Sequence, residues 1–176
     1  MFNRFFISRL FKPKGSNMSP APLVKDNITE LLVKVIEFTN MRHEILSHNI
    51  RDIRKNGFIP KDLEVKQFSN VMNFAIAEYV KNQRLLFQDT GNIKFGFNGS
   101  FKVQPVLDKE AMELLAISPD RYLEMQIEKL WENSLNRKIA TELLKQRQHM
   151  TVIKQLITRQ NNTLESDTLA LNRQWP

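Results

Sequence analysis

The chain has 176 residues, of which 41% are hydrophobic, so it is long enough for one domain with a buried core. It contains no cysteine, which excludes disulfides and thiolate metal sites. The formal net charge of +7 permits contact with nucleic acid or a membrane surface without requiring it. No run of the sequence reaches the roughly 20 apolar residues of a membrane-spanning helix.

The N-terminal end is basic. Residues 1–17, MFNRFFISRLFKPKGSN, contain arginine, lysine and several phenylalanines but no acidic residue. We interpret residues 1–25 as a basic, flexible extension. Three readings of residues 1–17 stay open: a disordered extension, an address peptide, or translation from a start codon upstream of a true start at Met18.

A long helix is predicted over residues 26–56. Apolar side chains recur every three or four positions from Ile28 to Ile53, which is the spacing of one helix face. Asn27 followed by Glu30 is typical of a capping box at a helix start. Gly57 takes the left-handed conformation of a helix end without strain, so the helix is expected to stop there.

The central region, residues 57–118, has a different pattern. Apolar positions at helical spacing predict a short helix over residues 65–87. The run NIKFGFNGSFKVQPV then alternates apolar and polar residues on either side of Asn98-Gly99. This pattern predicts a β-hairpin.

A second long helix is predicted over residues 119–158, followed by a flexible tail over 159–176. Ser118-Pro119 combines a capping residue with proline at the first helical position. Acidic residues gather in the first third of the segment and basic residues later, which complements the helix dipole. The predicted fold is therefore mainly α: two long terminal helices packed as a coiled-coil-like hairpin, with a small central α/β insert.

In the assembled state, the two terminal helices are expected to pack together along one shared apolar seam. Its members are the apolar residues that recur on one face of each helix. From the N-terminal helix they are Leu32, Val35, Ile36, Leu46 and Ile50, and from the C-terminal helix Ile127, Leu130, Leu135, Ile139 and Leu143.

The sequence carries no recognisable catalytic motif. The stretch HEILSH looks like a zinc-protease helix, but its histidines, His43 and His48, are five residues apart rather than four. They would point roughly 140° apart around a helix, so they cannot share a metal ion. There is no phosphate-binding glycine loop and no nucleophile motif. We therefore expect no enzyme activity, no metal, no cofactor and no small-molecule substrate.

At both ends the chain resembles the flagellar basal-body rod proteins. The stretch RHEILSHNIRDIRKNGF is similar to the family pattern R-x-E-I-L-A-x-N-I-A-N-A-x-T-P-G-Y, and the stretch EMQIEKLWENSL is similar to the pattern E-M-x-x-L-A-E-N-S-L. Asp52 replaces an asparagine of the first pattern, and Trp131 a small residue of the second. The matching residues are Arg42, Glu44, Ile45, Leu46, Asn49, Ile50, Gly57, Phe58, Glu132, Asn133, Ser134 and Leu135.

The resemblance implies a structural role. Rod proteins are exported by the flagellar type III apparatus and self-assemble through their terminal helices into the periplasmic rod of the basal body. The implied partners are other copies of the chain, other rod proteins, the hook-basal body complex and export-gate proteins. One alternative is a helical adaptor or export chaperone. A nucleic-acid-binding helical protein ranks lower, because the basic segments RDIRK and LLKQRQ have acidic neighbours.

Overall fold

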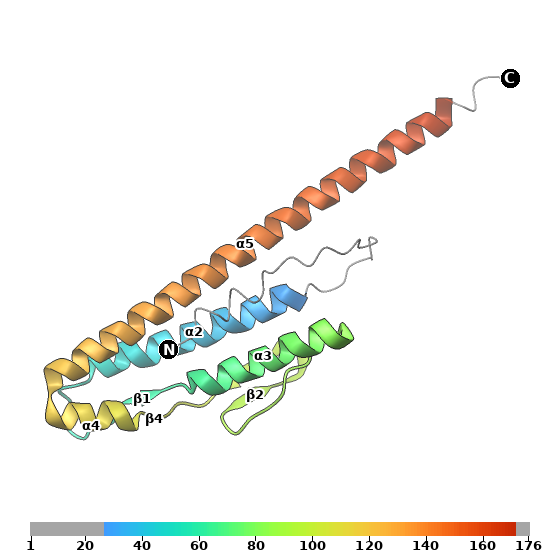
Figure 1. Cartoon of the computed structure of the whole chain (residues 1–176). Coiled ribbons are helices and arrows are strands. Elements are labelled where there is room, and N and C mark those ends of the chain that lie inside the picture. Colours follow the sequence, from blue (N-terminus) through green and yellow to red (C-terminus); the bar gives the residue numbers. More distant parts are fainter. Residues whose placement is uncertain (1–26, 172–176) are drawn as a thin grey trace. The chain divides into compact units, whose positions relative to one another are not determined.

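The computed structural model describes residues 27–171, with the side chains of residues 98 and 162–171 excepted. The predicted N-terminal extension, residues 1–25, lies outside this range, as do residues 172–176. The chain divides into two units, Met1–Thr141 and Glu142–Pro176. Within the described residues there are four α-helices and two small antiparallel sheets (Figure 1).

The first helix, α2 (Asn27–Arg51), buries the predicted stripe of Leu32, Val35 and Leu46. It ends at Arg51 rather than at residue 56. Consecutive turns follow, with the Lys55 amide bonded to the Asp52 carbonyl. Gly57 adopts a φ of +73°, which is the left-handed conformation expected of it. It lies in the loop after α2, however, and not at the end of the helix.

Two short strands and a helix were not predicted. β1 (Lys61–Asp62) pairs antiparallel with β4 (Val106–Leu107), and α4 (Lys109–Ile117) follows at once. Two residues are too few for a periodic pattern, and only the tertiary structure brings these strands together. The α4 helix has a local signal, because the Asp108 carboxylate accepts the Ala111 amide at 3.1 Å as an N-cap.

The predicted central helix and hairpin are both present. α3 (Val65–Asn82) ends at Gln83, which has a φ of 54°, instead of continuing to residue 87. β2 (Ile93–Phe95) and β3 (Phe101–Val103) pair antiparallel, with Phe95 opposite Phe101. They are joined through a 3₁₀ turn, Phe97–Gly99, which contains the Asn98-Gly99 pair.

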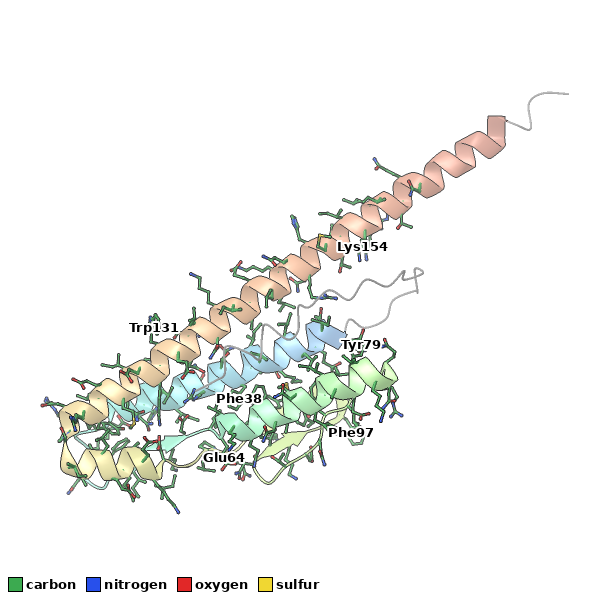
Figure 2. All side chains as sticks on the ribbon, in the orientation of Figure 1. Phe38, Glu64, Tyr79, Phe97, Trp131 and Lys154 are labelled. Carbon is green, nitrogen blue, oxygen red and sulfur yellow. The ribbon has the colours of Figure 1, made fainter. Side chains whose placement is uncertain are left out.

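Phenylalanine rings join this insert to α2. Phe38 of α2, labelled in Figure 2, stacks on Phe68 of α3 with 4.0 Å between ring centroids. Phe68 in turn contacts Phe101 of β3. Lys34 of α2 is buried, and its ammonium group binds the Gly99 carbonyl oxygen at 2.5 Å. The hairpin is therefore joined to α2 through the Phe68 ring of α3 and directly by the charge-assisted hydrogen bond from Lys34.

The last helix, α5 (Pro119–Leu171), begins where predicted, after Ser118. It continues to Leu171, past residue 158, where the predicted helix ended. Residues 159–171 contain neither glycine nor proline, and nothing in them ends a helix. In the first unit, α5 packs against α2 as the predicted helical hairpin (Figure 1). No described helix has the length and apolarity needed to cross a membrane.

Candidate functional site

The contact between α2 and α5 is polar at its centre. Asn49 of α2 donates its side-chain NH₂ to Gln126 Oε1 of α5 at 3.0 Å. The Tyr122 hydroxyl donates to the Asn49 carbonyl at 3.2 Å, and the Asn133 amide donates to the Thr39 carbonyl at 2.8 Å. All five residues are buried. We call Thr39, Asn49, Tyr122, Gln126 and Asn133 the polar seam.

Asn49 also connects the seam to β1. Its side-chain NH₂ donates to the Lys61 carbonyl at 2.7 Å, and its side-chain oxygen accepts the Lys61 amide at 3.3 Å. One side chain therefore pairs with the strand backbone on one side and with Gln126 of α5 on the other. The buried amides fix how α5 is rotated against α2, because each bond needs one particular partner atom.

A charged cluster lies beside the seam and consists of Arg42, Asp62, Asp108 and Lys129. Both Asp62 oxygens accept from the Arg42 guanidinium at 2.8 Å. The Lys129 ammonium lies 2.5 Å from Asp108 Oδ2 and 3.7 Å from Asp62 Oδ2. Arg42 comes from α2, Asp62 from β1, and Lys129 from α5, while Asp108 caps α4. The cluster therefore ties four elements together.

An open pocket of about 650 Å³ lies over this cluster. Its lining includes Arg42, Asp62, Asp108 and Lys129, whose charged groups already bind one another. A ligand would have to break these ion pairs to bind the charges. The arrangement is therefore suited to holding these four elements in place.

The two histidines of the opening motif lie in different surroundings. His43 is half-buried, and its Nδ1 atom has no hydrogen-bond partner in the part of the chain that the structure describes. His48 is exposed and contacts Arg51 and Asp52. Among the described residues, no group of three or more His, Asp or Glu side chains is placed to hold a metal ion.

The residues that resemble the rod signature fall into three groups. Those that are buried make the specific contacts described above, apart from Leu46, which is a core residue. The buried set is Arg42, Leu46, Asn49 and Asn133; the half-buried set is Ile45, Ile50, Phe58, Glu132 and Ser134; the exposed set is Glu44, Gly57 and Leu135.

The predicted apolar seam forms only in part. On α2, Leu32, Val35 and Leu46 are buried, and Ile36 and Ile50 are half-buried. On α5, Leu130, Ile139 and Leu143 are half-buried, but Ile127 and Leu135 are exposed.

Within a single chain, Ile127 and Leu135 therefore lie outside the contact between the two helices, and the seam predicted for the assembled state stays a prediction. The polar residues Tyr122, Gln126 and Asn133 occupy the inner face of α5, which turns Ile127 and Leu135 outward. The side chains of α2 are shared with the insert, as the Phe38–Phe68 stack and the Lys34–Gly99 bond show.

Several residues of the site were missed from the sequence. Tyr122, Gln126, Lys129 and Asn133 are three or four residues apart and so share one helix face, which is a signal that could have located them. The signal is weak because a polar helix face usually lies in solvent. Asp108 had no signal beyond its position before α4.

Two ionisable groups near the contact are perturbed. Burial, with a contribution from the Asp108 charge, raises the pKa of Tyr122 to about 12. A hydrogen bond from the Lys55 ammonium lowers the pKa of Asp52, outweighing the opposing effect of burial. The tyrosine is thus held neutral as a donor, and the carboxylate is held charged in the turn after α2.

Comparison with protein-family models, curated proteins and solved structures finds no match to this chain. The resemblance to flagellar rod proteins therefore rests on the residues near the two ends of the chain alone.

Proposed function

We propose that this protein is a structural, non-catalytic subunit of the flagellar basal-body rod. The observation that supports it most is where the rod-like residues lie. Asn49, from the N-terminal signature, bonds to Gln126, and Asn133, from the C-terminal signature, bonds to the carbonyl of Thr39. The two signatures are far apart in sequence, yet both supply buried polar atoms to one contact between α2 and α5.

In an assembling subunit, the polar seam fixes which face of α5 is turned outward. Buried amides with fixed partners hold α5 in one rotation against α2, whereas an apolar contact would tolerate sliding. That rotation turns Ile127 and Leu135 outward, where a neighbouring subunit can cover them. In this proposal, polar contacts fix the packing of α5 against α2 within one chain, and apolar contacts join neighbouring chains.

The proposal carries a location and a set of partners. The subunit would pass through the flagellar type III apparatus and join other copies, other rod proteins and the hook-basal body complex in the periplasmic rod. A chain without cysteine has no disulfide to prevent unfolding during export. The exposed apolar residues of α5 would be covered on assembly, which offsets the cost of ordering.

The decisive experiment is localisation in the source organism. Deleting the gene should abolish motility, and basal bodies isolated from a complemented strain should contain the protein. A protein found only in the cytoplasm, bound to an exported flagellar client, would instead favour the adaptor or chaperone alternative. If the protein is recovered together with nucleic acid, and nuclease treatment abolishes this, the result would favour a nucleic-acid-binding helical protein.

A further inference from the structure

The outward face of α5 in the first unit carries an apolar strip. Ile127, Trp131 and Leu135 are spaced four residues apart, and 56%, 73% and 41% of their surfaces are exposed. Positions four apart differ by about 40° around a helix, so the three side chains form one ridge. Figure 2 shows Trp131, the central residue, on the side of α5 turned away from α2. Tryptophan exposed between two aliphatic residues is typical of the centre of an interface.

The charges beside the strip are placed symmetrically. Glu124 and Lys138 lie seven residues before and after Trp131, and both are exposed. Seven residues are close to two helical turns, so both lie on the same side of α5 as Trp131. The strip therefore has matched apolar positions on either side of its centre and opposite charges at its two ends.

We propose that this strip is the contact between two copies of the chain, in an antiparallel dimer whose two-fold axis passes beside Trp131. Such an axis sets Ile127 against Leu135 of the second copy and Glu124 against its Lys138. A parallel pair in register would instead place Glu124 against Glu124 and Lys138 against Lys138. The charges thus favour the antiparallel arrangement and oppose the parallel one.

The dimer is weak and independent of the proposed function. A few turns of one helix bury less than the roughly 800 Å² per partner of a standard interface, so it dissociates on dilution. A two-fold contact closes on itself and cannot extend a rod. If the protein is a rod subunit, the dimer is a form of the unassembled chain that covers Leu135. Failure to dimerise in solution and failure to enter basal bodies are separate results.

Cross-linking of the purified full chain tests the arrangement. The chain has no cysteine, so one introduced cysteine is the only reactive thiol. A Glu124→Cys chain and a Lys138→Cys chain, carrying different tags, are mixed and treated with a short bismaleimide. We expect more cross-linked dimer between the two different variants than between two copies of the same variant. A predominance of like-with-like products overturns the antiparallel arrangement, and a yield no higher than that of an exposed Glu113→Cys control overturns the dimer.

Sedimentation of cysteine-free chains tests the residues. Trp131→Ala should abolish self-association, whereas Ile117→Ala, at an equally exposed apolar position on α4, should leave it unchanged. Glu124→Lys should raise the dissociation constant by roughly twofold to thirtyfold, since two exposed ion pairs are lost. Adding Lys138→Glu to the Glu124→Lys chain should return the dissociation constant to that of the unchanged protein. Equal association of the Trp131→Ala and Ile117→Ala chains, or no restoration by the double reversal, overturns the proposal.

Discussion

Arg42 and Asp62 show why a residue that resembles a family signature need not be part of an interface. The guanidinium and the carboxylate form two hydrogen bonds of 2.8 Å in a largely buried position. A buried pair of this kind contributes little net stability, but losing one partner leaves an uncompensated charge. Its effect is to specify where β1 lies against α2.

Removing the carboxylate alone should therefore be costly. We expect Asp62→Ala to lower the free energy of unfolding by about 3–5 kcal/mol, because the Arg42 charge stays buried without its partner. The double change Arg42→Met with Asp62→Leu should cost much less, since no charge is left unpaired. Urea denaturation followed by circular dichroism measures both. Equal losses in the two variants would show that the pair is not buried as described. The exposed pair Lys145–Glu142 provides the control, with Lys145→Ala costing at most about 1 kcal/mol.

Tyr122 provides a pH test of the polar seam. Its pKa is raised to about 12, so between the ordinary value of 10.0 and about 12 the unfolded chain has lost a proton that the folded chain keeps. Its contribution to stability is therefore fully present below pH 10 and is lost as the pH rises to about 12. The chain has two tyrosines, Tyr79 and Tyr122, and the tyrosinate absorbance that belongs to Tyr122 should rise in a step with a midpoint near 12. The step should vanish in Tyr122→Phe, and a midpoint near 10 for this residue would mean that its hydroxyl is solvated.

At the scale of elements, the rotation of α5 depends on side chains that look like surface residues. Gln126 and Asn133 are at most 1% exposed, whereas Ile127 is more than half exposed. The Nε2 group of Gln126 has no hydrogen-bond partner among residues 27–171, so the Asn49–Gln126 bond is retained at some cost. Asn49 matters more than Gln126 because it also pairs with both backbone groups of Lys61.

Among the side-chain amides of the polar seam, Asn49 should therefore cost the most stability when it is replaced. We expect Asn49→Ala to cost about 1–3 kcal/mol, since it leaves the Lys61 amide and carbonyl and the Gln126 oxygen without this partner. The matched control is Asn40→Ala, an exposed position on the same helix, which should change stability by less than about 0.5 kcal/mol. Thermal unfolding of both chains measures the difference. Similar effects at the two positions would argue against the polar seam.

The hairpin turn depends on one backbone conformation. Gly99 has a φ of +76°, and a Cβ placed there would meet nothing within 4 Å. Gly99→Ala should therefore destabilise only through the left-handed backbone, by about 1–2 kcal/mol. Gly91→Ala has the same open surroundings without a positive φ and is expected to be close to neutral. Denaturant titration of the two variants checks this, and a neutral Gly99→Ala would mean that the turn relaxes freely.

At the scale of the whole molecule, burial separates residues that hold the fold from residues available for assembly. Leu46 is 0% exposed, and Leu135 is on the outer face of α5, although both belong to the predicted seam. A charge at Leu46 would be buried in the core, so it would disturb the fold itself. Leu135 can be changed with the fold intact, which makes it the informative position.

We therefore expect Leu135→Asp to keep normal stability and expression but to be absent from isolated basal bodies. The Leu46→Asp chain should be destabilised, and it should be absent from basal bodies because it does not fold stably. Val80→Asp, at an exposed apolar position on α3, should enter basal bodies normally. Immunoblots of purified basal bodies, alongside melting curves of the purified chains, give the comparison. Normal incorporation of Leu135→Asp would remove the apolar face of α5 from the proposed rod contact.

Local pattern was sufficient for four features. The spacing of apolar residues predicted α2, Ser118-Pro119 placed the start of α5, and the alternation around Asn98-Gly99 predicted the hairpin. These features depend on residues within one or two turns of each other, so the sequence contains the whole cause. The pairing of the two long helices was also predicted, although the face of α5 that packs on α2 is the polar one.

Tertiary contacts decided the rest. Strands β1 and β4 exist only because two distant residue pairs meet, and α2 ends at Arg51 because the chain turns there toward β1. The inner face of α5 was decided by hydrogen bonds from Gln126 and Asn133 to atoms of α2. Apolar pattern determines that a helix must be covered. Which of its faces is turned inward depends on where donors and acceptors of another element lie, and those positions exist only in the folded chain.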